Sequence, residues 1–244
     1  MKICILTDCT AMFPSHPSTH GGVIRSLTVK TVDGKLAPPT VDDFSHAYNE
    51  LEGQFSHILV LSGAEGILPA AESARDAAKS HGGVAHISVL DTGQTGVGVG
   101  LLAQLGAQAA AEGASLPEIE NSIRVAIPNL YTLICSGLET LLDESESGRT
   151  AQMMTLEDGE LVPYKKIRTR RHLLETLQEF MDEFEHPRHI VYSRGRVSII
   201  RTRPLRDSAG SLFPHIPFRE MENNLAINLL FGQHTVGLTI METP

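Results

Sequence analysis

The amino-acid sequence predicts an α/β fold in two domains: a parallel sheet with helices on both faces, followed by a second, smaller α/β domain. Short apolar runs in the first half each end in a polar loop that opens a helix, which is the pattern of repeated β-α units. The pattern changes after Pro128, where a hairpin and further strand and helix segments follow. At 244 residues the chain is long enough to bury a sizeable core.

The first domain is predicted to span residues 1–136. Its parallel strands are short apolar runs of the kind that lie buried inside a sheet, namely Ile3–Leu6, His57–Leu61 and Ala85–Leu90. Apolar residues at helical spacing predict three helices, which follow Pro39-Thr40, cover about Ala70–Ser80, and run from Gly96 to Ala109. A further strand is expected over Leu27–Val32, closed by the turn Asp33-Gly34.

The second domain is predicted to span residues 137–244. The strand Leu130–Cys135 leads to it through a short helix, Leu138–Leu142, and a polar linker over 143–150. The turn Asp158-Gly159 predicts a hairpin, and a basic helix start over Lys165–His172 comes next. Five later segments are expected to form strands or to alternate strand with helix: His189–Ser193, Val197–Thr202, Phe218–Glu222, Ala226–Phe231 and Val236–Met241.

Composition and charge argue against several classes of function. The formal net charge of −9 disfavours a nucleic-acid binder, because contacts to phosphates require a basic surface. The 3 cysteines include no CxxC pair and indicate reduced thiols, as in a cytoplasmic protein. No apolar run approaches the roughly 20 residues of a membrane span, and the run after Met1-Lys2 is too short for a signal peptide. We therefore expect a cytoplasmic protein without stable membrane insertion.

Polar residues follow the three predicted parallel strands at their carboxyl ends. Asp8 and Thr10 follow the first strand, Ser62 and Gly63 the second, and Thr92 the third. Ligands of parallel sheets bind at this edge, so these residues are candidates for holding a head group. Asp8 alternatively caps the next helix. A haloacid-dehalogenase-type nucleophile would need an aspartate where Thr10 stands, and Ser62 lacks the G-x-S-x-G order of a nucleophile elbow.

The loop from Thr92 to Gly100 is rich in glycine. The loop joins a strand to a helix. Its backbone N–H groups, together with Thr95 and Gly96 within it, are therefore suited to receive an anion, including a carboxylate. The loop has neither the G-x-G-x-x-G order nor a P-loop lysine, so its nucleotide signal is weak. The alternative is that its glycines serve only tight packing.

Two further candidates lie in the second domain. His234 follows an apolar run, and a single histidine there is either a ligand-binding or a structural residue. Arg168 belongs to a basic concentration over 165–171, whose simplest interpretation is a solvated helix start. Its guanidinium also suits a carboxylate or a phosphate. The histidines show no HxxxH or HExxH spacing, so neither a metal nor another cofactor is expected.

Seven motifs, in the same order along the chain, give this sequence a resemblance to the DegV-like family. Leu6–Ala11 resembles the family's opening V-T-D-S-T-A, and Val89–Thr92 with Gly98 and Gly100 is similar to its V-x-D-[ST] loop and glycine pair. The other similar segments are Leu27-Thr28-Val29 with Asp33-Gly34-Lys35, Pro39–Phe44, Glu72-Ser73-Ala74, Gly159–Arg168 and Gly232–Thr235. On these motifs the chain is identified as a shortened and divergent member.

The resemblance implies a protein that binds one long-chain fatty acid. The acyl tail is then expected in an apolar tunnel between two domains, with the carboxylate near the tunnel mouth. The residues implied for ligand binding are Asp8, Thr10, Ser62, Gly63, Thr92, Thr95, Gly96, Arg168 and His234. In bacteria such proteins are the binding subunit of a fatty acid kinase, and a separate kinase subunit forms the acyl phosphate. The resemblance therefore implies a non-catalytic protein with a kinase as its partner.

The sequence departs from the family at the carboxylate site. Ala70 and Gly96 stand where the family has a threonine and a serine, and the hydroxyls expected to replace them are those of Ser62, Thr92 and Thr95. Two other functions stay open. One is a phosphotransferase-like subunit that acts on a small phosphate or carboxylate ligand, which is an analogy of fold alone. The other is a degenerate binding module that has lost its lipid.

Overall fold

The structure, a computed structural model, describes residues 2–15, 23–141 and 150–243. It divides into two compact units. The first comprises Met1–Pro128 with Asp158–Glu160, and the second comprises Asn129–Glu157 with Leu161–Pro244. The division falls after Pro128, so the strand Leu130–Ser136 belongs to the second unit, whereas the sequence places the domain boundary after residue 136.

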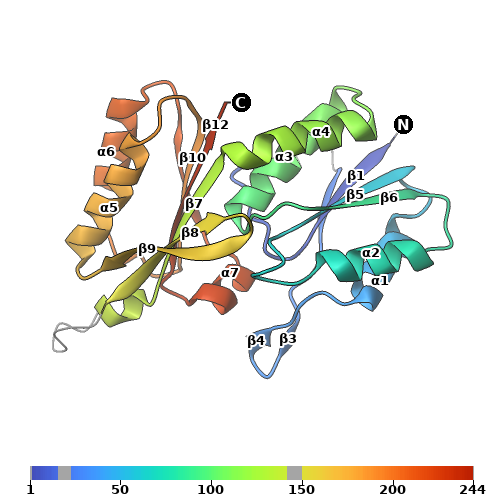
Figure 1. Cartoon of the computed structure of the whole chain (residues 1–244), viewed down its shortest axis with the longest axis horizontal. Helices are drawn as coiled ribbons and strands as arrows, with labels where there is room; N and C mark the ends of the chain where they lie inside the picture. The colour runs from blue at the N-terminus through green and yellow to red at the C-terminus, as the bar shows by residue number, and fades with distance from the viewer. Residues whose placement is uncertain (1, 16–22, 142–149, 244) are drawn as a thin grey trace. The chain divides into compact units, whose positions relative to one another are not determined.

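The first unit is built on a four-stranded parallel sheet (Figure 1). Its strand order is β2-β1-β5-β6, with the bounds Ile24–Ser26, Ile3–Thr7, His57–Ser62 and His86–Asp91. The apolar strands β1 and β5 are almost wholly buried, as expected for strands that are covered on both faces. The parallel sheet predicted from the sequence is confirmed.

Helices α1 (Val41–Leu51) and α2 (Ala71–Ser80) cover one face of this sheet (Figure 1). They form one buried cluster in which Phe44 and Tyr48 of α1 pack with Leu6 and other side chains from that face. The Tyr48 hydroxyl also donates a hydrogen bond to the backbone oxygen of Ala74 at 3.0 Å, which joins the two helices.

Helices α3 (Val97–Ala111) and α4 (Leu116–Ala126) cover the opposite face (Figure 1). Because side chains alternate along a strand, Ile5 points to this face while Leu6 points to the other. Gly106 of α3 has no side chain between it and Ile5 or Ile123 of α4, so the three elements approach closely. Helices on both faces confirm the predicted doubly covered sheet.

Side chains cap three of the four helix starts in this unit. The Asp43 carboxylate accepts a hydrogen bond from Thr40 N at 2.9 Å before α1, and Glu118 accepts one from Ser115 N at 2.7 Å before α4. The Glu65 carboxylate accepts from the first N–H groups of α2. By contrast, the N-cap residue of α3 is Gly96, which has no side chain, and among the described residues no side chain is seen to cap the start of this helix. Its first N–H groups are therefore oriented toward the strand ends without a side-chain acceptor.

One expectation for the first unit is wrong in extent. The strand predicted over Leu27–Val32 is reduced to β3, Thr31–Val32, which pairs with β4, Lys35–Leu36. Both residues of the turn between them, Asp33 and Gly34, have positive φ, as the expected turn requires. The segment directly follows β2, and Leu27 N still donates to Thr7 O at 2.9 Å; it leaves the sheet after that because β1 ends at Thr7.

The second unit is built on a six-stranded sheet in the order β11-β10-β12-β7-β8-β9 (Figure 1). The strand bounds are Leu130–Ser136 for β7, Ala151–Glu157 for β8, Glu160–Ile167 for β9, Pro187–Arg194 for β10, Phe218–Glu222 for β11 and Val236–Glu242 for β12. Strands β10 and β11 are parallel, while β12 is antiparallel to both of its neighbours.

Three helices complete the second unit: α5 (Arg170–Asp182), α6 (Arg203–Leu212) and α7 (Leu225–Phe231). Helices α5 and α6 bury Leu177 and Leu205 in one core cluster with side chains of β7, β10 and β12. Short 3-10 helices cover Ile127–Asn129 and Leu138–Leu141. The linker predicted over 143–150 lies outside the described residues except for residue 150.

The basic segment over 165–171 does not form one helix start. Lys165 to Ile167 continue the strand β9, and α5 begins only at Arg170. The reason is local, because the Thr169 hydroxyl accepts a hydrogen bond from His172 N at 3.0 Å and so sets the helix start.

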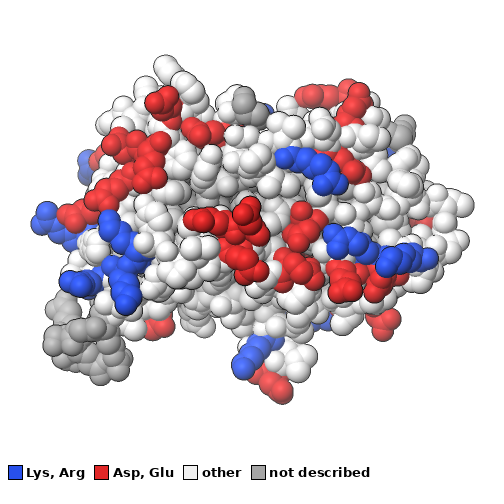
Figure 2. Space-filling model, in the orientation of Figure 1, with Lys and Arg blue, Asp and Glu red and all other residues white. Residues whose placement is uncertain are grey.

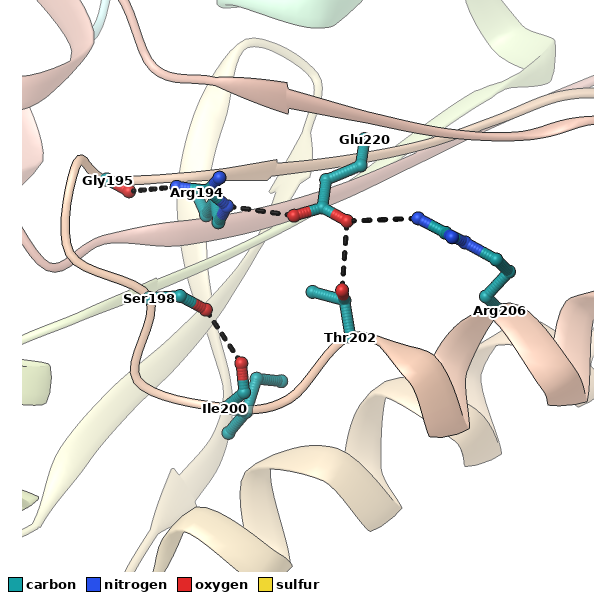
Figure 3. Close-up of polar contacts among 7 residues, drawn as sticks. All are labelled: Arg194, Gly195, Ser198, Ile200, Thr202, Arg206 and Glu220. Carbon is teal, nitrogen blue, oxygen red and sulfur yellow. Dashed lines mark hydrogen bonds and ion pairs between the residues drawn. The ribbon is translucent and has the colours of Figure 1, made fainter.

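The strand expected over Val197–Thr202 is a loop. Both edges of β10 are already paired, with β11 and with β12, so no further strand can add there. The loop is held by its own polar contacts, in which Ser198 donates to Ile200 O and Thr202 donates to the Glu220 carboxylate at 2.9 Å (Figure 3). The segment Ala226–Phe231 belongs to helix α7, which Asn224 caps.

Figure 2 shows acidic side chains spread over the face drawn, with basic side chains in smaller groups among them. Among the residues that the structure describes, no helix has the length and apolar character needed to cross a bilayer.

We predict that Gly100→Ala destabilises the first unit. A β-carbon at Gly100 would overlap the backbone oxygen of Met12, and backbone cannot move as a side-chain end can. The loss in the free energy of unfolding should exceed about 2 kcal/mol. The matched control is Gly210→Ala on α6, where a β-carbon meets nothing and a gain of about 0.5–1 kcal/mol is expected. Chemical denaturation of both variants measures this, and equal stabilities would contradict it.

Candidate functional site

The carboxyl ends of β1, β5 and β6 bring together the polar residues that the sequence singles out. In the sheet register Thr7 lies beside Leu61, and Ser62 lies beside Asp91. The residues that follow, Asp8, Gly63 and Thr92, therefore meet at one edge of the sheet.

Asp8 is fully buried and both of its carboxylate oxygens have partners within the first unit. Oδ1 accepts hydrogen bonds from Thr10 N at 2.7 Å and Thr10 Oγ1 at 2.6 Å, and Oδ2 accepts one from Gly63 N at 2.5 Å. Burial raises the pKa of Asp8, and the charge of Asp91 adds to this effect. The three hydrogen bonds act in the opposite direction and lower the pKa, but the net shift is upward. With its oxygens occupied, Asp8 positions the loop after β5.

Gly63 is the point where the loops after β1, β5 and β6 meet. A β-carbon there would lie 3.1 Å from Asp8 Oδ2, 3.1 Å from Gln94 O and 3.3 Å from Thr10 Oγ1. The next residue, Ala64, donates its N–H to Gln94 O at 2.7 Å. Gly63 thus serves close backbone packing, which aligns the three loops.

Thr92 is placed at the same edge, but its hydroxyl is used by the fold. Oγ1 donates to Ser62 O at 2.8 Å and accepts from Gln94 N at 3.2 Å. Of the hydroxyls expected to replace the family's carboxylate contacts, that of Thr92 is therefore already bonded. Its contacts instead fix the position of Ser62.

The hydroxyls of Ser62 and Thr95 are buried without a hydrogen-bond partner among the described residues, and Gln94 Oε1 is in the same condition. Ser62 is 0% exposed and Thr95 is 2% exposed. A buried polar group without a partner costs about 1–3 kcal/mol, so folded proteins keep few of them, and two in the loops after neighbouring strands indicate a use. These hydroxyls are the groups of the site that remain able to donate to a ligand.

Gly96 and the start of α3 supply the electrostatics of the site. Gly96 has φ of 56°, which a glycine adopts readily, and its oxygen accepts from Met12 N at 3.0 Å. Since no side chain caps α3, the partial positive charge of the helix start is free to act on an anion beside Thr95.

His234 and Arg168 belong to the second unit and do not lie next to each other. His234 immediately precedes Thr235 and β12, is partly buried, and has an Nδ1 atom without a partner among the described residues. Arg168 is exposed after the end of β9. Both lie at the same end of the strands. Strands β7 and β8 lie between β12 and β9, so the spacing of neighbouring strands places β12 and β9 on the order of 14 Å apart.

The sequence did not point to two polar residues that lie near His234 in the second unit, Asn223 and Asn228. The amide oxygens of Asn223 and Asn228, like Nδ1 of His234, are buried and have no hydrogen-bond partner among the described residues. The only signal in the sequence was an Asn pair before an apolar run, which is typical of a helix cap. Among the described residues, no group of three or more His, Cys, Asp or Glu is arranged for a metal ion.

Comparison with known proteins agrees with this architecture. A family model described as "Uncharacterised protein, DegV family COG1307" matches residues 29–142. No curated protein matches this chain.

Three solved structures illustrate the likeness in fold. A fatty acid binding DegV family protein from Streptococcus agalactiae has 19% identity and a TM-score of 0.81, with 100% of both chains covered. A DegV lipid binding protein from Thermotoga maritima has 18% identity and a TM-score of 0.80, with 99% of both chains covered. A DegV family protein from Eubacterium eligens, loaded with heptadecanoic acid, has 16% identity and a TM-score of 0.77, covering 99% of this chain and 100% of that chain.

We predict that Asp8→Asn lowers stability by about 1–3 kcal/mol near neutral pH, because the amide nitrogen must face a backbone N–H group. The pH dependence has a definite sign. The folded state raises the Asp8 pKa above 3.8, so it holds a proton that the unfolded chain has lost. The stability contributed by Asp8 is therefore full below about pH 3.8 and falls as pH rises through the raised pKa.

The variant lacks this contribution, so the difference in unfolding free energy between wild type and Asp8→Asn should shrink as pH rises. Urea denaturation between about pH 4 and pH 7 measures the difference. Asn49→Ala, at an exposed position of α1, is the control and should show no such trend, because it removes no titratable group. A difference that grows with pH would contradict the prediction.

Proposed function

From the premise that this chain is a DegV-like protein, we propose that it binds a long-chain fatty acid and does not itself catalyse a reaction. The observation that carries the proposal is the pair of buried, unpartnered hydroxyls of Ser62 and Thr95 at the strand ends of the first unit. The neighbours described as fatty acid binding proteins support the class of ligand.

The chemistry of a carboxylate matches this pair. An ionised carboxylate is purely an acceptor, and a hydroxyl without a partner needs an acceptor for its proton. Hydrogen bonds to an ionised group are shorter and stronger than those between neutral groups. The uncapped start of α3 adds a favourable field for a negative charge. We propose that the two hydroxyls and the helix start together receive the carboxylate.

Asp8 is a part of this proposal in an indirect role. Its oxygens are engaged by Thr10 and Gly63, so it holds the loop that carries Ser62 and does not contact the carboxylate. This arrangement avoids placing a second acceptor against the ligand.

The acyl tail is expected to supply most of the affinity. Each buried methylene contributes about 0.8 kcal/mol, so a chain of about sixteen carbons outweighs the loss of one or two hydrogen bonds at the carboxylate. We propose that the tail occupies an apolar tunnel between the two units, with His234 and Arg168 as further contacts of the carboxylate. The proposal also includes a cytoplasmic location and a separate kinase subunit that receives the exposed carboxylate.

A binding role is supported by the absence of an activated thiol among the described residues. Burial raises the pKa of Cys4, Cys9 and Cys135 to about 12, so these thiols stay protonated at neutral pH and are poor nucleophiles.

We predict that Ser62→Ala combined with Thr95→Val weakens palmitate binding by on the order of 100-fold, from the loss of two hydrogen bonds to a charged group. The same variant should be as stable as wild type without ligand, or more stable, because two unpartnered buried hydroxyls are removed. Delipidated protein is incubated with palmitate, and binding is measured by native mass spectrometry and calorimetry.

The matched control is Thr176→Val in the second unit. Thr176 also has a fully buried hydroxyl without a described partner, but it lies on α5 within the core. The control should gain stability without a change in palmitate affinity. A wild-type protein that purifies empty and gains no palmitate would refute the proposed function. Equal affinity in wild type and the double variant would refute the role of these hydroxyls.

A further inference from the structure

The side chain of Gln94 lies against the first turn of α3 in the first unit. A β-carbon at Gly98, the second residue of that helix, would be 2.7 Å from Gln94 Oε1, 3.0 Å from Gln94 Cβ and 3.3 Å from Gln94 Cδ. Gln94 is 5% exposed, and its Oε1 atom is buried without a hydrogen-bond partner among the described residues. The absent side chain of Gly98 therefore leaves the space in which the carboxamide of Gln94 sits.

Backbone contacts hold Gln94 between the loops that follow β5 and β6. Its N–H donates to Thr92 Oγ1 at 3.2 Å, and its backbone oxygen accepts from Ala64 N at 2.7 Å. The next residue, Thr95, accepts from Gly98 N at 3.0 Å through its backbone oxygen. Gln94 and Thr95 thus both contact Gly98, and each of them carries a buried polar atom without a described partner.

A carboxamide is not needed to fill this space. A buried polar atom without a partner lowers stability, whereas a leucine would fill a similar volume without a polar atom. The start of α3 has Gly96 as its N-cap residue, and among the described residues no side chain caps it. The helix start thus presents donors, and Gln94 Oε1 presents an acceptor. A head group that has both an acceptor and a donor matches the two.

The charged groups on the three strand-end loops of the first unit are all acidic. Residues 8–13, 62–70 and 91–97 include Asp8, Glu65 and Asp91 and no Lys, Arg or His. Glu65 accepts from the first N–H groups of α2, and the charge of Asp91 raises the pKa of Asp8. Neighbouring acids oppose the binding of an anion, whereas the start of α3 favours it. Neither effect acts strongly on a neutral head group, so these loops do not require a charged one.

We infer that Gln94 is a specificity-determining residue and that the site also binds long-chain primary amides. The amide oxygen of such a ligand accepts at the start of α3, and its NH2 group donates to Gln94 Oε1. The orientation of Gln94 in the structure serves this ligand without change. The inference goes beyond the proposed function, and it rests on that function only for the place of the head group and for the apolar tail.

A carboxylate uses the other end of the same carboxamide. An ionised carboxylate has no proton, so Gln94 Oε1 has nothing to accept from it. A half turn about the last torsion of Gln94 exchanges Oε1 with Nε2, and this turn breaks no hydrogen bond of Oε1. Nε2–H then donates to the carboxylate. A glutamine therefore serves an acid and an amide alike, whereas a glutamate serves only the amide and a leucine serves neither.

The test compares palmitate with palmitamide, because the two ligands share a tail and differ only in the head group. The full chain is delipidated and titrated by calorimetry at about pH 8, where a carboxylic acid is ionised, with each ligand supplied from cyclodextrin. Wild type should bind palmitamide with an affinity within about tenfold of that for palmitate.

Substitutions at Gln94 should change the preference between the two head groups. Gln94→Glu accepts from an amide and repels an acid, so it should keep palmitamide within about threefold of wild type and weaken palmitate by at least about 30-fold. Gln94→Leu should weaken both ligands about tenfold without lowering the melting temperature, because it removes an unpartnered oxygen. Gln108→Glu, at an exposed position of α3, is the matched control and should leave both affinities unchanged.

The outcomes separate this inference from the proposed function. A wild type that binds palmitate but not palmitamide overturns the inference and leaves the proposed function standing. A wild type that binds palmitamide but not palmitate does the reverse, and one that binds neither overturns both. Binding of both ligands with a preference shifted toward palmitamide in Gln94→Glu supports the inference. Unchanged affinities in both Gln94 variants overturn the role of Gln94, and if Gln94→Glu does not fold, the palmitamide affinity of Gln94→Leu decides.

Discussion

The buried carboxylate of Asp8 is the contact on which the candidate site depends. It lies at the end of β1 and binds backbone or hydroxyl donors from Thr10 and Gly63, so it joins the loops that follow two neighbouring strands. Gly63 is equally necessary, because a side chain there would press on Asp8 and on Gln94 O. The site is therefore built by backbone proximity, and its side chains are held in place by one desolvated acid.

This scaffold uses some polar groups for the fold and leaves others, which the proposed function assigns to a ligand, without described partners. The hydroxyl of Thr92 is bonded within the first unit and supports the position of Ser62. The hydroxyls of Ser62 and Thr95 are left without described partners although they are buried. Unpartnered donors destabilise the unliganded protein, and a carboxylate that satisfies them recovers the loss on binding. Stability and binding are thus coupled through the same atoms.

The second unit follows the same principle around His234. Gly195 N and the side-chain nitrogen of Asn223 both donate to the backbone oxygen of Thr235, the residue after the histidine. Among the described residues, Nδ1 of His234 and the amide oxygens of Asn223 and Asn228 are left without partners. In both units, the hydrogen bonds that are formed set the geometry of the loops.

The sequence by itself determined three of the four parallel strands, three of the four helices that cover the sheet and the residues at the strand ends, because apolar periodicity, turn glycines and caps are local signals. It also placed Asp8, Ser62 and Thr95 among the candidates. Only the tertiary structure decided which polar groups are occupied. The hydroxyl of Thr92 donates to a residue 30 positions away, and the N–H of Gly63 donates to a residue 55 positions away. Likewise, the segment after β10 is a loop because distant strands already pair with both edges of β10. Such long-range competition for hydrogen bonds leaves no periodic trace in the sequence.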